Sequence, residues 1–83
     1  MEEDAHAAVI RVQPNPVHGV CAVQWEGPPL QWLEVLDPSG RVLMRSGPPS
    51  KGTIDLSGMA PGLVVVRVTD VEGRCTSAGV LVE

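Results

Sequence analysis

Residues 61–74, Pro-Gly-Leu-Val-Val-Val-Arg-Val-Thr-Asp-Val-Glu-Gly-Arg, carry the strongest strand signal of the chain between two turn signals. Pro61-Gly62 and Glu72-Gly73 are turn chemistry, because Pro fixes φ and Gly accepts a positive φ. The valines between them suit a pleated, half-buried surface. Alternation predicts a core-facing set and an outward-facing set. Val64, Val66 and Val68 are expected to face the core, and Leu63, Val65 and Arg67 are expected to face outward.

Three further turn signals lie N-terminal to this stretch, at Pro14-Asn15-Pro16, at residues 37–40 (Asp-Pro-Ser-Gly) and at residues 54–57 (Ile-Asp-Leu-Ser). The apolar runs between the turns are too short for helices. The turn at 37–40 joins two runs into a hairpin. The spacing predicts an all-β antiparallel sandwich of about seven short strands. The expected strands are 9–13, 20–25, 31–36, 41–45, 53–56, 63–69 and 74–82.

The 83 residues form one small domain whose core must be aliphatic, because Phe and Tyr are absent. Residues 1–8 are acidic and then Ala-rich, without strand alternation, so we expect a linker or disordered segment there. The sandwich should occupy residues 9–83. The expected core is Val23, Leu33, Val35, Val42, Ile54, Leu56, Val64, Val66, Val68, Val80 and Val82.

Composition argues against nucleic acid as a partner. The net charge is −4, and six Lys and Arg residues spread along the chain form no basic stripe. Trp25 and Trp32 are the only aromatic residues, so no stacking platform for bases is expected. No apolar run approaches the roughly 20 residues of a spanning helix. The acidic start, Met-Glu-Glu-Asp, does not resemble a signal peptide, so any export leader is expected further upstream in a longer precursor.

The residues that could carry chemistry favour no enzyme, metal or cofactor. His6 and His18 lack partners at metal-ligand spacing. Asp37 and Asp55 are interpreted as turn or cap residues rather than a catalytic pair. No serine lies in a Gly-x-Ser-x-Gly elbow.

The two cysteines leave an alternative open. A bridge between Cys21 and Cys75 would contribute about 4 kcal/mol in an oxidising compartment. The sequence shows no C-x-x-C spacing, and nothing in it brings the two residues within reach of each other. We therefore favour two free thiols over a disulfide.

The order of the turn motifs resembles the C-terminal sorting domain of the Por, or type IX, secretion system. Members of that family have Tyr-Pro-Asn-Pro near the start, Asp-x-x-Gly-Arg mid-chain, Ile-Asp-Leu-Ser followed by Gly-x-Tyr, and a Val-rich last strand. This chain is similar to that pattern in the order of its motifs. The resemblance covers residues 9–83 and implies an immunoglobulin-like seven-stranded sandwich. The matching motif positions are Pro14, Asn15, Pro16, Asp37, Gly40, Arg41, Asp55 and Gly62.

The resemblance implies a role in protein targeting rather than an enzymatic reaction. Such domains direct an N-terminally fused cargo across the outer membrane, where a surface sortase removes the domain and attaches the cargo to the cell surface. The expected partners are the cargo and the type IX machinery, with its outer-membrane shuttle and sortase. The expected location is the periplasm in transit, then the outer-membrane surface or the medium. With Val80 and Val82 inward, the expected recognition residues are Gly79, Leu81 and Glu83.

An immunoglobulin-like structural or adhesive module of a bacterial surface protein is the alternative, because the same motifs suit either role. A sorting signal must end its precursor. The chain ends within its last strand, which favours sorting as an expectation. An enzyme is a distant third. Exposed Leu63 and Val65, with unpaired edge strands, would also allow weak self-association.

Overall fold

The computed structural model describes residues 9–48 and 52–83, so the predicted linker 1–8 lies outside the described residues. Within this part of the chain the protein is all-β, without a helix, as predicted. Each expected strand is present, with its ends within one residue of the predicted ones. The strands are β1 Val9–Gln13, β2 Val20–Glu26, β3 Leu30–Leu36, β4 Val42–Ser46, β5 Thr53–Asp55, β6 Gly62–Asp70 and β7 Cys75–Val82.

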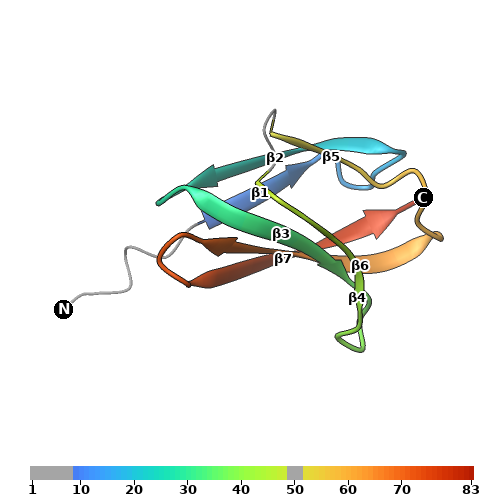
Figure 1. Ribbon diagram of the computed structural model, residues 1–83. Helices are drawn as coiled ribbons and strands as arrows, with labels where there is room; N and C mark the ends of the chain where they lie inside the picture. Colours follow the sequence, from blue (N-terminus) through green and yellow to red (C-terminus); the bar gives the residue numbers. More distant parts are fainter. Residues whose placement is uncertain (1–8, 49–51) are drawn as a thin grey trace.

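The strands form two antiparallel sheets packed face to face (Figure 1). One sheet has the order β1-β2-β5 and the other has the order β4-β3-β6-β7. The chain therefore crosses between the sheets after β2, after β4 and after β5. This cross-connected pairing is typical of immunoglobulin-like sandwiches, so the predicted fold class is confirmed.

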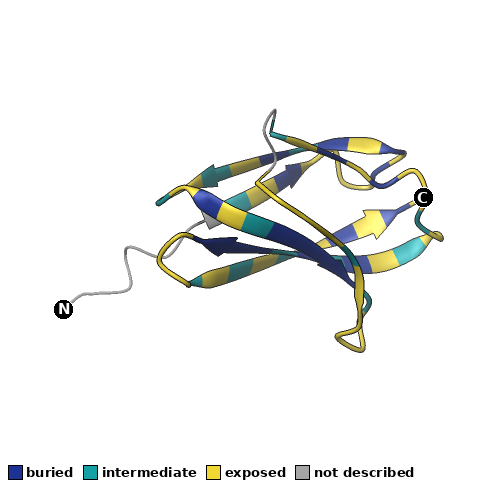
Figure 2. Ribbon diagram, viewed as in Figure 1, coloured by how far each residue is buried: buried dark blue, intermediate teal, exposed yellow. Residues whose placement is uncertain are grey.

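The core lies between the two sheets and is aliphatic, as the absence of Phe and Tyr predicted (Figure 2). Leu33, Val35 and Val66 on the central strands β3 and β6 are fully buried. Trp25 and Met44 pack against this cluster from its margins. Every expected core residue except Val42 is buried.

The prediction for Val42 was wrong, because β4 contains a bulge. Val35 pairs with Met44, but the next residue of β3, Leu36, pairs with Val42. The extra residue in β4, Leu43, reverses the alternation of side chains beyond it. Met44 therefore faces the core, while Val42 lies on the outer face of the sheet and is 44% exposed.

Two hairpins, β3–β4 and β6–β7, are closed by the same five-residue pattern, Asp-x-x-Gly-Arg, at residues 37–41 and 70–74. In each turn the aspartate Oδ1 accepts a hydrogen bond from the arginine backbone N–H, at 2.9 and 3.0 Å. The aspartate carbonyl accepts another from the glycine N–H. The glycines Gly40 and Gly73 adopt φ of +94° and +87°. The motif is thus a self-contained turn.

The carboxylate of Asp37 is held in its ionised form by this turn. The hydroxyl of Ser39 donates to Oδ1 at 2.6 Å, and the backbone N–H groups of Arg41 and Ser39 also donate to it. These hydrogen bonds, that of the Ser39 side chain first, lower the pKa of Asp37 below its usual value. The motif positions Asp37, Gly40 and Arg41 therefore have a structural role in this fold.

We expect Gly40→Ala to destabilise the domain by about 1 kcal/mol, because alanine is strained at φ of +94°. A Cβ at Gly40 would have open space around it, so the loss comes from backbone conformation and not from a clash. Gly47→Ala is the matched control, since Gly47 also has open space but no positive φ. Urea unfolding measures both, and equal stability of the two variants would contradict this account.

Candidate functional site

The segment between β1 and β2 lies along the free edge of β7, the strand that holds the predicted recognition residues. The side chain of Asn15 accepts a hydrogen bond from the Leu81 N–H at 2.9 Å through Oδ1. Its Nδ2 donates a longer one, 3.4 Å, to the Gly79 carbonyl. One amide side chain thus occupies a donor and an acceptor of β7, as a neighbouring strand would. We call this pair of contacts the Asn15 clasp.

Val17 continues the cover that Asn15 begins. Its N–H donates to the Leu81 carbonyl at 2.8 Å, and its carbonyl accepts from the Glu83 N–H at 2.9 Å. The contact is a short parallel bridge, and the Val17 side chain is fully buried. The chain therefore leaves the three-stranded sheet after β1 and protects the C-terminal half of an edge strand of the other sheet.

The predicted recognition residues are exposed, but part of their backbone is already paired. Leu81 and Gly79 lie on the outer face of β7, and the Leu81 side chain is opposite Leu63 of β6. Glu83 Oε1 lies 3.0 Å from Nε2 of His18. Recognition at Leu81 and Glu83 would use their side chains, because Asn15 and Val17 occupy the backbone of Leu81. The clasp was not predicted from the sequence, although an Asn between two prolines could have indicated a segment without regular strand pairing.

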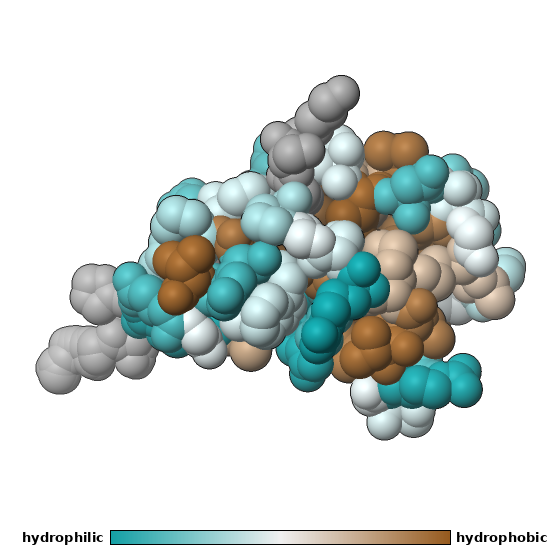
Figure 3. Space-filling view, viewed as in Figure 1, coloured by the Kyte–Doolittle hydropathy of each residue, from teal (hydrophilic) through white to brown (hydrophobic). Residues whose placement is uncertain are grey.

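An apolar surface covers one half of the outer face of the four-stranded sheet. Strand register places Val42, Leu36, Val65 and Gly79 in one row across the sheet, and Leu63 and Leu81 pair in the next row. Leu63 also lies over Gly79, since a Cβ there would be 3.7 Å from Leu63 Cδ1. We call the accessible part of these rows the apolar patch; it consists of the exposed Val42, Leu63 and Leu81 and the half-buried Val65. In Figure 3 hydrophobic residues gather at the lower right, where β4 lies in Figure 1, directly beside strongly hydrophilic ones.

On the same face, the row that adjoins Val42, Leu36 and Val65 on the side away from Leu63 is an ion cluster centred on Glu34. Nε and Nη2 of Arg45 donate to Oε2 at 3.0 and 2.6 Å, and the same atoms of Arg67 donate to Oε1 at 3.0 and 2.7 Å. Glu34 is only 2% exposed. The hydrogen bonds from Arg45 and then Arg67 lower the pKa of Glu34, and Glu34 in turn raises the pKa of Arg67.

A hollow of about 400 Å³ lies over this cluster. Arg45 lies over the ring of Trp32, with the guanidinium carbon 5.4 Å from the ring centroid, a cation–π distance. On the other side the Thr69 hydroxyl lies 3.3 Å from the Cys75 sulfur. The hollow therefore presents cationic, aromatic and polar groups side by side.

The remaining motif positions lie in loops or at strand ends rather than on this face. Asp55 Oδ1 accepts from the Ser57 N–H at 2.9 Å, and hydrogen bonds from Ser57 lower the pKa of Asp55. Gly62 begins β6 at φ of +139°. Pro14 and Pro16 flank the clasp and are exposed.

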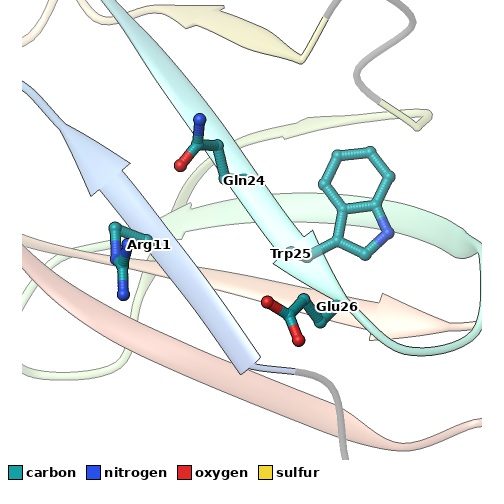
Figure 4. Close-up of a pocket in the computed structure, with 4 residues that line it drawn as sticks. All are labelled: Arg11, Gln24, Trp25 and Glu26. Carbon is teal, nitrogen blue, oxygen red and sulfur yellow. The ribbon is translucent and has the colours of Figure 1, made fainter.

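Two further hollows open elsewhere on the surface. One of about 490 Å³ is lined by Asp37, Arg41, Leu43 and residues 58–64. The other, about 230 Å³, lies where β1 meets β2 (Figure 4). Arg11 comes from β1, and Gln24, Trp25 and Glu26 come from β2, with the indole turned away from Arg11. Neither hollow contains a residue predicted for recognition.

Both cysteines are free thiols, the state that sequence analysis favoured. Cys21 faces the core from β2, and burial raises the pKa of its thiol. Cys75 is exposed at the start of β7. The two side chains thus lie on different sheets, one inside the sandwich and one outside it.

We expect Asn15→Ala to loosen the clasp and to speed amide hydrogen exchange at Leu81 about fivefold, because the hydrogen bond from the Leu81 N–H to the Asn15 side chain contributes about 1 kcal/mol. Asn15→Asp is the matched variant. It keeps the acceptor for the Leu81 N–H and loses the donor to Gly79, so exchange at Leu81 should stay near the parent rate. Exchange followed by NMR tests both, and identical rates in all three proteins would refute the clasp.

No group of three metal-ligating side chains is found in residues 9–48 and 52–83. The same residues contain no helix long and apolar enough to cross a membrane. The surface features described above are a clasped last strand, an apolar patch and an ion cluster on one sheet. Comparisons with family models, with curated proteins and with solved structures find no match to this chain.

Proposed function

We propose that this domain is a C-terminal sorting signal of the type IX secretion system, read in its folded form. In this role it directs an N-terminally fused cargo across the outer membrane, for sortase processing and attachment at the cell surface. The recognised surface is the outer face of β7 together with the apolar patch. The domain would pass through the periplasm and act at the outer-membrane surface, with no catalytic function of its own.

The observation that carries the proposal is the contact between the two ends of the chain segment that resembles the family. Residues 14–17 hold the motif near the start of the chain, and residues 79–83 form the end of the last strand. Hydrogen bonds join Asn15 and Val17 to Gly79, Leu81 and Glu83, although Asn15 and Leu81 are 66 residues apart. The motifs thus support one surface feature, a terminal strand of fixed position.

A fixed strand suits a signal that a receptor must bind. The Asn15 clasp and the Val17 bridge hold the backbone in place, so docking orders few additional groups and costs less conformational entropy. Leu81 and Leu63 meanwhile remain exposed, at 43% and 53%. Exposed leucines side by side are typical of interaction surfaces.

The test is an export assay in a bacterium that has a type IX apparatus. Residues 1–83 are fused behind a leader and a fluorescent reporter, and the reporter is measured in the periplasm, on the surface and in the medium. We expect the intact fusion to leave the periplasm. Leu81→Ser should retain it there, because this change removes an exposed apolar contact while the buried Val80 and Val82 stay in the core.

Val71→Ser is the matched control, since Val71 is similarly exposed, at 55%, but lies in the β6–β7 turn. It should be exported like the parent. Unfolding curves of both purified variants check that the domain stays folded. A folded intact fusion that stays in the periplasm would contradict the sorting role and favour the structural or adhesive module instead.

A further inference from the structure

The ion cluster beside the apolar patch has hydrogen-bonding capacity beyond what the pairing with Glu34 uses. We propose that Arg45 and Arg67 together bind a carboxylate on a protein partner, whose apolar side chains pack on the apolar patch. The inference rests on the proposed function in one respect only: it assigns this partner to the secretion machinery.

The two guanidinium groups are held in place and yet only half used. Each donates to Glu34 through the edge formed by Nε and Nη2. Because the group is planar, its other edge, formed by Nη1 and the second hydrogen of Nη2, points away from Glu34. Their side chains are 62% and 40% exposed, so these free edges reach solvent. A second carboxylate can therefore accept the paired hydrogen bonds that arginine favours.

The charge of the cluster favours an anion. Two arginines share one carboxylate, so the cluster has a net charge of about +1. Arg41 and Arg74 differ, because each pairs with the aspartate of its own turn. Trp32 lies beside Arg45 and shields one face of its guanidinium from water, which strengthens an ionic contact. A protein of net charge −4 thus concentrates positive charge on the face that bears the apolar patch.

The position of the cluster defines the partner. Arg45, Glu34 and Arg67 form one row across the sheet, and Val42, Leu36 and Val65 form the next row. Rows on one face of a sheet are about 7 Å apart. A partner that uses both rows must present an acidic side chain about 7 Å from an apolar one. Residues i and i+2 of an extended segment lie on one side of it and provide this spacing.

The probe is the acetylated, amidated peptide Asp-Thr-Val-Thr-Leu, and its control has Asn in place of Asp. NMR of the full 83-residue chain follows the arginine Nε–H signals and the backbone signals of the apolar patch during titration. We expect the Asp peptide to bind at least about fivefold more tightly than the Asn peptide. We also expect this difference to shrink in high salt.

Arg45→Lys and Arg67→Lys keep the charge and the pairing with Glu34 but lose the planar fork. They should bring the affinity ratio of the two peptides close to one, whereas Arg41→Lys, in the β3–β4 turn, should leave it unchanged. Melting curves check that each variant is folded. Equal binding of the two peptides by the parent, or an unchanged ratio in both Lys variants, overturns the proposal. So does a dimer in sedimentation that buries this face and excludes the peptide.

The export assay separates the two proposals. If the intact fusion is exported and the double Lys variant is retained, the carboxylate site serves the machinery. If both are exported equally, the assignment to the machinery is wrong. If the intact fusion itself stays in the periplasm, the sorting role fails, while discrimination between the peptides still supports the carboxylate site.

Discussion

Leu33→Ala is expected to destabilise the domain by about 2–5 kcal/mol. Leu33 lies in β3 between β4 and β6, and its side chain is fully buried. The change removes apolar contacts and leaves a cavity in a close-packed core of aliphatic side chains. Small domains unfold with a total of about 5–15 kcal/mol, so the loss should be visible as a large shift of the urea midpoint at 25 °C.

Leu63→Ala is the matched control for this change, because it removes the same atoms from a leucine that is 53% exposed. We expect a loss of less than about 0.5 kcal/mol. Equal losses at the two positions would mean that the sheets do not enclose the core described above.

Glu34→Gln is expected to lower the Tm at pH 7 by more than Gly40→Ala does, and to flatten the dependence of stability on acid. Arg45 and Arg67 lower the pKa of Glu34 below its usual value of about 4.5. The folded state therefore binds the proton more weakly than the unfolded state. The stabilisation is fully present above about pH 4.5 and is lost as the pH falls through the lowered pKa.

Thermal melts between pH 7 and pH 2 measure this effect. The parent should lose stability below about pH 4.5, and the Glu34→Gln variant should start lower and lose less. Some acid dependence should remain in the variant, because the pKa values of Asp37 and Asp55 are also lowered. Glu72→Gln, which breaks an exposed pair with Arg74, should leave the Tm at pH 7 nearly unchanged. Parallel curves for the parent and Glu34→Gln would rule out this role for Glu34.

The sequence by itself determined the strands, the turns and most of the core. These features depend on local physics: alternation every two residues decides which side chains of β6 face inward, and Asp-x-x-Gly-Arg closes its turn with its own hydrogen bonds. The absence of Phe and Tyr from the sequence likewise required an aliphatic core. Such signals lie within a few residues of one another, and a single sequence is enough to find them.

Only the tertiary structure decided which residues form the candidate binding surface. Val42 faces outward because a bulge changes the pairing of β4 with β3, and no turn residue signals an extra residue in mid-strand. Glu34 is buried because two arginines, 11 and 33 residues away, close over it from the neighbouring strands. Asn15 holds a strand that begins 60 residues later in the sequence. Each of these contacts exists only after distant strands have paired, because the groups that make them are brought together by sheet order and not by spacing along the chain.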